Sequence, residues 1–128
     1  MAWVFLCAAS ALAMDDAEAL KSFELFRTQW IQKLMKHGFY GRKHVKFVKS
    51  DDEPVVRAVY KQLGPVKTTR IKKTSSAQCP YVGVLSYEEL VFESTGPTRE
   101  IARQGPFVCS RRVTITEIFR FSNGKWIY

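Results

Sequence analysis

The sequence predicts an α+β domain in which one long N-terminal helix packs on a curved antiparallel sheet of about four to five strands. Two observations give this prediction. Apolar residues recur every three or four positions between residues 15 and 37, and the rest of the chain is rich in β-branched and aromatic residues punctuated by Gly and Pro. A helix followed by consecutive antiparallel strands is an α+β order, and 128 residues suffice for one domain.

The first element is a helix predicted from Asp15 to His37. Its apolar residues form one stripe along the helix: Leu20, Phe23, Phe26, Trp30, Ile31, Leu34 and Met35. Acidic side chains occupy its first turn and basic side chains its last turn, which suits the helix dipole. Gly38 is expected to end the helix in the left-handed conformation. A single apolar stripe needs a flat surface to cover, and the strand-rich remainder of the chain supplies it.

Residues 38–53 are interpreted as a basic loop, in which Val45, Phe47 and Val48 are expected to tuck under the helix. Residues 55–60 and 66–74 are two runs rich in β-branched residues. They flank Leu63-Gly64-Pro65, where Gly and Pro are typical of a turn. The sequence therefore predicts a hairpin over residues 55–74.

The next strand is predicted over residues 81–94, with a bulge near Glu88-Glu89 where the alternation changes phase. The C-terminal residues give the strongest local pattern. Apolar and polar residues alternate over 113–121, and Asn123-Gly124 is typical of a two-residue hairpin turn. This turn places Phe121 opposite Trp126, so aromatic side chains are expected to line one face.

The order of one helix followed by antiparallel strands resembles the cystatin-like and NTF2-like folds. The stretch Thr116-Glu117-Ile118-Phe119-Arg120-Phe121, followed by Gly124-Lys125-Trp126-Ile127-Tyr128, is similar to the close of small exported bacterial domains of that shape. The resemblance extends over residues 15–128 and implies a helix lying across a curved sheet, but no particular activity. The sequence has neither the Gln-x-Val-x-Gly loop of inhibitory cystatins nor the additional helices of larger NTF2-like enzymes.

Residues 1–13 are predicted to be a signal peptide, and residues 14–128 to form a single domain. The stretch MAWVFLCAASALA is apolar and ends in small residues at the two positions that signal peptidase reads, so cleavage is expected after Ala13. No Lys or Arg precedes it, which leaves two alternatives open: a different true start, and an apolar helix folded into the core. The stretch is shorter than the about 20 residues of a membrane span, so no transmembrane span is expected.

Removal of residues 1–13 would leave two of the three cysteines, Cys79 and Cys109. A disulfide between them would close a loop of about 30 residues and stabilise the domain by about 3 kcal/mol. Such bonds form in the oxidising compartments to which a signal peptide directs a protein. The alternative left open is a pair of free thiols.

The sequence contains no recognisable catalytic or cofactor-binding motif. His37 and His44 are accompanied by no CxxC or HxxxH spacing, so no metal site is expected. There is no GxSxG elbow, and the seven glycines are scattered rather than gathered into a phosphate-binding loop. The protein is therefore expected to have no catalytic activity and no cofactor.

Glu117 is the one carboxylate that the C-terminal alternation places on the apolar face of the sheet. An unpaired carboxylate is costly there, which makes Glu117 a candidate polar group in an aromatic ligand pocket. The candidate pocket residues are Trp30, Tyr87, Glu117, Phe119 and Trp126. Two structural alternatives are favoured over a pocket: a bulge near Thr116 that turns Glu117 outward, and a salt bridge to a strand arginine such as Arg70.

The formal net charge is +8, and the positive charge is concentrated between residues 42 and 73, where ten Lys and Arg accompany three acidic residues. The candidates for an anion-binding surface are Arg42, Lys43, Lys46, Lys49, Lys67, Arg70, Lys72 and Lys73. Such a surface would suit an anionic component of the cell envelope. Alternatively, the lysines only block strand addition and keep the protein in solution. Nucleic acid is disfavoured, because few aromatic residues for base stacking accompany the basic ones.

Together these observations predict a non-catalytic, exported binding domain of the periplasm or cell surface, which meets a protein or an anionic envelope component. The ligand is expected on the concave sheet face or on the basic loop. Two rival functions stay open. One is an NTF2-like small-molecule pocket protein or enzyme that uses Glu117, and the other is a basic nucleic-acid-binding protein.

Overall fold

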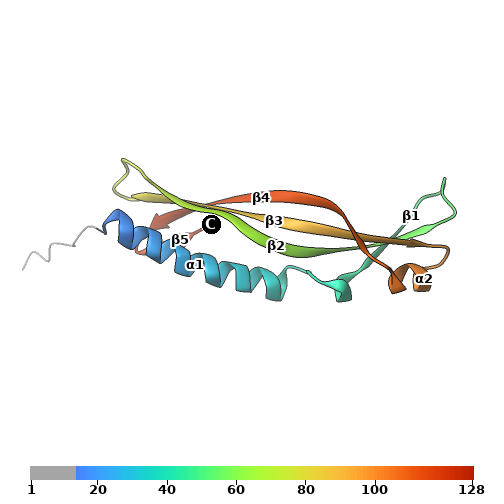
Figure 1. Ribbon diagram of the computed structural model, residues 1–128. Coiled ribbons are helices and arrows are strands. Elements are labelled where there is room, and N and C mark those ends of the chain that lie inside the picture. Colours follow the sequence, from blue (N-terminus) through green and yellow to red (C-terminus); the bar gives the residue numbers. More distant parts are fainter. Residues whose placement is uncertain (1–13) are drawn as a thin grey trace, which may run out of the picture.

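Figure 1 shows the computed structural model, which describes residues 14–128. This part of the chain forms two α-helices, α1 (Asp16–His37) and α2 (Arg99–Gln104), and a short 3-10 helix, η1 (Arg42–His44). Five strands make one antiparallel sheet in chain order: β1 (Lys46–Lys49), β2 (Val56–Lys73), β3 (Tyr81–Gly96), β4 (Val108–Ser122) and β5 (Lys125–Ile127). The predicted α+β architecture is confirmed, whereas the predicted signal peptide lies outside the described residues.

Helix α1 has the predicted extent to within one residue, but Gly38 ends it with a φ of -87° and not in the left-handed conformation expected. The Asp15 carboxylate accepts a hydrogen bond from the Glu18 amide at 2.7 Å, which satisfies one of the amides left free at the start of a helix. At the other end the Gly38 amide donates to the Leu34 carbonyl oxygen at 2.7 Å. No helix within residues 14–128 has the length and apolar composition needed to cross a membrane.

The main hydrophobic core lies between α1 and the adjoining parts of β3 and β4. Its largest fully buried side chains are Phe23, Leu85 and Phe119. The ring of Phe23 lies directly over Gly83, where an added Cβ atom would come within 2.5 Å of the ring. The absence of a side chain at Gly83 therefore leaves the space that the Phe23 ring occupies against β3. The Trp126 ring completes this packing, with its centroid 4.7 Å from that of Phe23.

Residues 56–73 form one long strand, so the hairpin predicted over residues 55–74 is wrong. Strand β2 pairs with β3 along its length, and Gly64 and Pro65 lie in a bulge where the register between the two strands shifts. Two residues of β2 oppose only Glu88 of β3 there, so the bulge predicted near Glu88 belongs to the neighbouring strand. A bulge tolerates proline, which lacks an amide proton for the ladder. The strand that forms a hairpin with β2 is β1, inside the segment predicted to be a basic loop.

The C-terminal hairpin is confirmed in its turn and its register. Phe121 pairs with Trp126 and Ser122 pairs with Lys125. The turn residues Asn123 and Gly124 have φ angles of 52° and 74°, as a two-residue turn that follows the strand twist requires.

The two helices cover opposite faces at opposite ends of the sheet. Tyr81, Leu85 and Tyr87 of β3 lie under α1, whereas α2 packs against Gly96, which the strand alternation places on the other face. We call the end under α1 the α1 half; it comprises β5, residues 66–73 of β2, 81–88 of β3 and 114–122 of β4. The α2 half comprises β1, residues 56–63 of β2, 89–96 of β3 and 108–113 of β4. Because the sheet twists along its length, both helices appear below it in Figure 1.

Candidate functional site

The five residues predicted to line a pocket lie together, as part of the packing beneath α1. Phe119 is fully buried, and Tyr87 and Trp126 are 3% and 9% exposed. The Trp30 and Phe119 rings pack edge to face, with their centroids 5.0 Å apart. Trp126 Nε1 donates a hydrogen bond to Ser22 Oγ at 3.1 Å. These side chains therefore fill the space between helix and sheet.

Glu117 faces α1 and is held there by a hydrogen bond. Trp30 Nε1 donates to Glu117 Oε2 at 2.7 Å. The register of β4 with β3 is unbroken around the pair Leu85 and Glu117, so no bulge near Thr116 turns the carboxylate outward. The partner is an indole N–H and not Arg70, which projects from the opposite face of the sheet. Both structural alternatives predicted for Glu117 are thus wrong, and the carboxylate instead ties α1 to β4.

Tyr40 and Tyr87 are two further polar side chains near Glu117. Burial raises the pKa of Tyr40 to about 12, and the negative charges of Glu89 and Glu117 contribute to the increase. Burial also raises the pKa of Tyr87, again with a contribution from the charge of Glu117. Both phenols therefore stay protonated at neutral pH and can donate hydrogen bonds to the neighbouring carboxylates.

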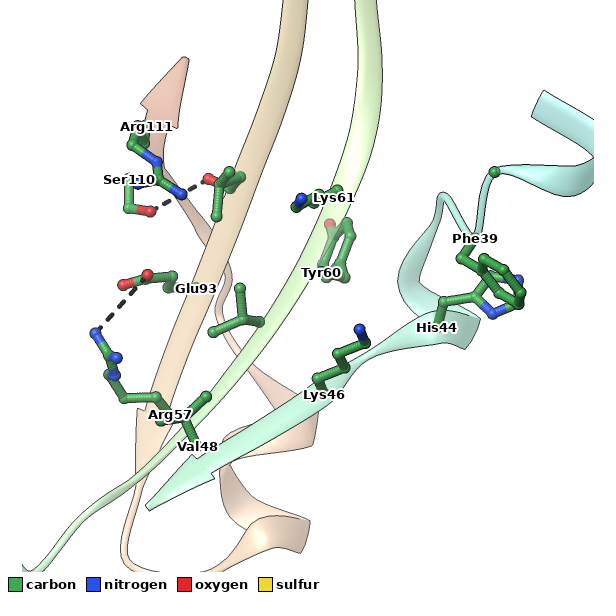
Figure 2. A pocket seen from close by; sticks show the side chains of 13 residues that line it. Phe39, His44, Lys46, Val48, Arg57, Tyr60, Lys61, Glu93, Ser110 and Arg111 are labelled. Carbon is green, nitrogen blue, oxygen red and sulfur yellow. Dashed lines mark hydrogen bonds and ion pairs between the residues drawn. The ribbon is translucent and has the colours of Figure 1, made fainter. Parts of the chain in front are cut away.

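Beyond the end of α1, the same face of the sheet carries an open groove of about 670 Å³ (Figure 2). The rings of Phe39 and His44 form one wall and meet edge to face at 5.4 Å. Valine side chains of three strands supply apolar surface. The groove is lined by Gly38, Phe39, His44, Lys46, Val48, Arg57, Val59, Tyr60, Lys61, Val91, Glu93, Ser110 and Arg111. None of the five residues of the predicted pocket is among them.

The linker between α1 and β1 positions this wall. The Gly41 amide donates to the Lys61 carbonyl oxygen at 2.8 Å, which fixes the linker to β2. Gly41 has a φ of 99°, a conformation that favours glycine, and η1 follows directly and carries His44. Phe47 is not tucked under α1 as expected, because it belongs to β1 and lies against the arginines of α2.

Basic side chains outnumber acidic ones along the groove. Arg57 Nη1 lies 3.9 Å from Glu93 Oε1. Lys61 Nζ lies 3.9 Å from Oε2 of Glu89, a residue that does not itself line the groove. Within residues 14–128, the other two strongly basic residues of the groove, Lys46 and Arg111, have no ion-pair partner. The groove therefore combines apolar surface with positive charge that no acidic side chain neutralises.

The valines and aromatic residues of the groove are not among the residues predicted from the sequence. The sequence does contain a local pattern that favours the strand pairing at the floor of the groove. Residues 46–49 are strand-like, residues 50–53 are typical of a turn, and the next strand begins at Val56. This order favours the observed pairing of residues 46–49 with residues 56–59.

The structure does not gather the eight predicted anion-binding residues into one surface. Lys46 lines the groove, whereas Lys67, Arg70 and Lys72 lie on the outer face of the α1 half, opposite α1. Arg42 donates to the carbonyl oxygens of residues 103 and 104 at 2.7 and 3.1 Å. The other three are dispersed, with Lys43 in η1, Lys49 at the end of β1 and Lys73 at the end of β2.

The predicted disulfide is also wrong, because Cys79 and Cys109 are free. Cys79 precedes Tyr81 at one end of β3, whereas Cys109 pairs with Phe92 near the other end. From Tyr81 to Phe92 the strand spans about 36 Å at about 3.3 Å per residue. A disulfide requires Cα atoms within about 7 Å of each other. The length of the β3–β4 hairpin, which cysteine spacing does not reveal, keeps the two thiols apart.

Within residues 14–128, no three His, Cys, Asp or Glu side chains come together as metal ligands. The chain matches no family model, no curated protein and no solved structure. The resemblance to the cystatin-like and NTF2-like folds therefore stays a prediction, and the groove is the feature of the molecule that bears on function.

Proposed function

We propose that the protein is a non-catalytic, exported binding domain that holds an anionic ligand with an apolar portion in the groove of the α2 half. One observation carries this proposal: an open groove of about 670 Å³ combines apolar valines with basic side chains that have no acidic partner within residues 14–128. Ligand sites are typically concave and largely apolar, with a few polar groups that orient the ligand.

Lys46 is the basic residue best placed to meet the anionic group. It lies on β1 opposite Val59, and its side chain extends into the groove between the Phe39 wall and the strands of the floor (Figure 2). A hydrogen bond to a charged group contributes about 1.5–3 kcal/mol. A carboxylate, sulfonate or phosphate on an apolar body would therefore meet both the charge and the valines.

The fluorescent probe 1-anilinonaphthalene-8-sulfonate tests this proposal, because it joins a sulfonate to aromatic rings. We expect its fluorescence to rise on binding to the full chain. Lys46→Glu should weaken its binding about tenfold, the loss of one charge-assisted contact. Lys49→Glu is the matched control, because Lys49 lies on the same strand with its side chain on the opposite face.

The two variants have the same net charge, so a general electrostatic effect would weaken probe binding equally in both. We expect less than about a twofold change for Lys49→Glu, because its charge lies outside the groove. Equal losses in the two variants, or no binding to the unmodified chain, would contradict the proposal.

The exported location depends on residues 1–13. Mass spectrometry of the protein from its native host should show a chain that begins at Met14, since cleavage is expected after Ala13. An intact chain from residue 1 to residue 128 in the cytosol would overturn this part of the proposal.

The cystatin-like or NTF2-like fold belongs to the same proposal, and its support is one long helix on a curled sheet whose five strands follow chain order. The rival pocket around Glu117 has less support, because its residues fill the space beneath α1. The nucleic-acid rival predicts steeply salt-dependent binding to RNA or DNA. The alternation of β2, β3 and β4 places no aromatic side chain among the basic residues of the outer face in the α1 half, where bases would stack.

A further inference from the structure

Two long strands lie near the edges of the sheet and are only partly covered. Strand β1 pairs with residues 56–59 of β2, and β5 pairs with residues 120–122 of β4. Within residues 14–128, no other strand pairs with the outer side of β2 or of β4. Each strand therefore leaves a row of backbone N–H and C=O groups that a further strand can bind.

The edge of β2 carries several features that block strand addition. Its register shifts at the bulge that contains Gly64 and Pro65, and Lys61 and Lys67 flank this bulge. Helix α1 lies alongside, and Arg27 Nη1 donates to Thr69 Oγ1 at 2.9 Å. Bulges, proline, lysines and a covering helix are the usual protections of an exposed edge.

Within residues 14–128, no bulge, proline, lysine or covering helix protects the edge of β4 over residues 111–118, where the charged residues are Arg111, Arg112 and Glu117. The stretch contains no Gly, Pro or Lys, and five of its eight residues are β-branched. Its register with β3 is unbroken. A register shift at Ser110 bounds it on one side, and β5, which pairs from Arg120 onward, bounds it on the other. A regular, exposed edge of this kind is a site of strand pairing.

We infer that a second copy of this chain pairs with residues 111–117 of β4, antiparallel about a twofold axis at Thr114. The two sheets would then join into one continuous sheet of ten strands. This association does not require the ligand proposed for the groove, although Arg111 lines that groove as well.

Charge complementarity selects both the partner and the register. Residues directly opposite each other in an antiparallel pair point to the same face. An axis at Thr114 places Arg111 of one copy opposite Glu117 of the other, and the symmetry repeats this pair. Both side chains lie on the face that carries α1 and the groove, and Arg111 has no acidic partner within residues 14–128. An axis at Ile115 would instead place Glu117 opposite Val113 and lose both pairs.

Disulfide trapping tests this register. In the full chain with Cys7→Ser, Cys79→Ser and Cys109→Ser, Thr114→Cys should form a disulfide-linked dimer under mild oxidation. Opposite residues in an antiparallel pair have Cα atoms about 4.5–5.5 Å apart, within the range of a disulfide. Thr116→Cys is the control, because the two copies of this position would lie about 13 Å apart at about 3.3 Å per residue.

Sedimentation velocity on the unmodified chain gives an independent readout. We expect a concentration-dependent dimer whose dissociation constant rises about tenfold in Arg111→Glu, since this variant places like charges opposite each other twice. Arg120→Glu makes the same charge change outside the paired stretch and should leave the constant within about twofold. Circular dichroism would verify that each variant is folded.

A monomer at all concentrations would overturn the inference. Equal cross-linking of the two cysteine variants would contradict the register, and so would equal effects of the two arginine variants. Lys46, which the groove test changes, takes no part in the pairing of residues 111–117, so failure of the groove test leaves these outcomes unchanged.

Discussion

The α1 half and the α2 half of the sheet differ in how much helix covers them, and chain geometry explains the difference. Helix α1 has 22 residues, whereas β2 has 18 and β3 has 16. At about 1.5 Å per helical residue and about 3.3 Å per strand residue, the helix is about 33 Å long and β2 about 59 Å. One helix therefore covers little more than half of the sheet, and the groove begins where the helix ends.

The α2 half uses its short helix on the other face. Helix α2 has 6 residues and covers the end of β3 through Ala102. Within residues 14–128, the face that carries α1 therefore remains open here, while the α1 half holds the largest fully buried side chains. This division would separate stability from the binding proposed for the groove, since the packed half can hold the strands that position an open and more polar groove.

The largest expected effect tests where stability resides. Phe23→Ala should lower the free energy of unfolding by about 3–5 kcal/mol, because Phe23 is fully buried and its ring fills the contact with Gly83 and Trp126. Phe47→Ala is the matched change in the α2 half. It should lower the free energy of unfolding by only about 1–3 kcal/mol, because Phe47 is only partly buried. Urea unfolding followed by circular dichroism measures both values. Equal losses would mean that the two halves contribute equally to stability.

A smaller effect is expected for the hydrogen bond that ties α1 to β4. Trp30→Phe removes the donor to Glu117 and keeps an aromatic ring, so we expect a loss of about 1 kcal/mol, because the acceptor that loses its partner is only partly buried. Adding Glu117→Leu should recover part of this loss, because removing both partners costs less than removing one.

The probe affinity of the groove should stay within about twofold of the unmodified protein in both of these variants, since their residues lie beneath α1. Strictly additive losses would show that the indole and the carboxylate do not interact, and loss of probe binding would mean that the two halves are coupled.

The helix caps offer a still smaller test in the two halves. Thr98 Oγ1 accepts a hydrogen bond from the Ile101 amide at 3.3 Å, so Thr98→Ala should cost about 0.5–1 kcal/mol. Asp15→Ala removes the corresponding cap of α1 and should cost about 1 kcal/mol. Hydrogen exchange should show faster exchange confined to α2 in the first variant and to the first turn of α1 in the second. Faster exchange throughout the chain in either variant would contradict separate behaviour of the halves.

The parts of the fold that depend on local pattern could be predicted from the sequence. Helix α1 carries its own stripe and caps, and the C-terminal hairpin carries its own turn at Asn123-Gly124. The single strand over residues 56–73 could not be recognised locally, because Gly64-Pro65 is compatible with both a turn and a bulge. The choice between them depends on β3, which pairs with residues on both sides of Pro65.

The site divides in the same way. The inward position of Glu117 follows from strand alternation and could be predicted, but its hydrogen bond to Trp30 joins residues 87 positions apart and could not. Lys46 is the only groove residue among the site residues predicted from the sequence, because the groove arises from the difference in length between α1 and the strands. The groove residues come from the linker between α1 and β1 and from four strands, so no short sequence motif contains them.

The smallest expected effect is a pH dependence of stability, and it involves the β2 bulge at Gly64 and Pro65. The bulge brings Lys67 Nζ to 2.7 Å from Glu88 Oε1, while Arg112 Nη1 lies 3.2 Å from Glu88 Oε2. The hydrogen bond from Lys67, together with the positive charges of Lys67 and Arg112, lowers the pKa of Glu88 below its usual 4.5 despite the burial of this carboxylate.

A carboxylate whose pKa is lower in the folded state stabilises the protein above the pKa of the unfolded chain, and this contribution is lost as the pH falls through the folded pKa. Glu88→Gln should therefore lower the melting temperature at pH 7, and the gap from the unmodified protein should close as the pH falls from about 5 to about 3. Glu93→Gln is the control, because its 3.9 Å contact with Arg57 is more exposed and should contribute little at any pH. A gap for Glu88→Gln that stayed constant down to pH 3 would show that the carboxylate in the bulge acts through its shape alone, and not through its charge.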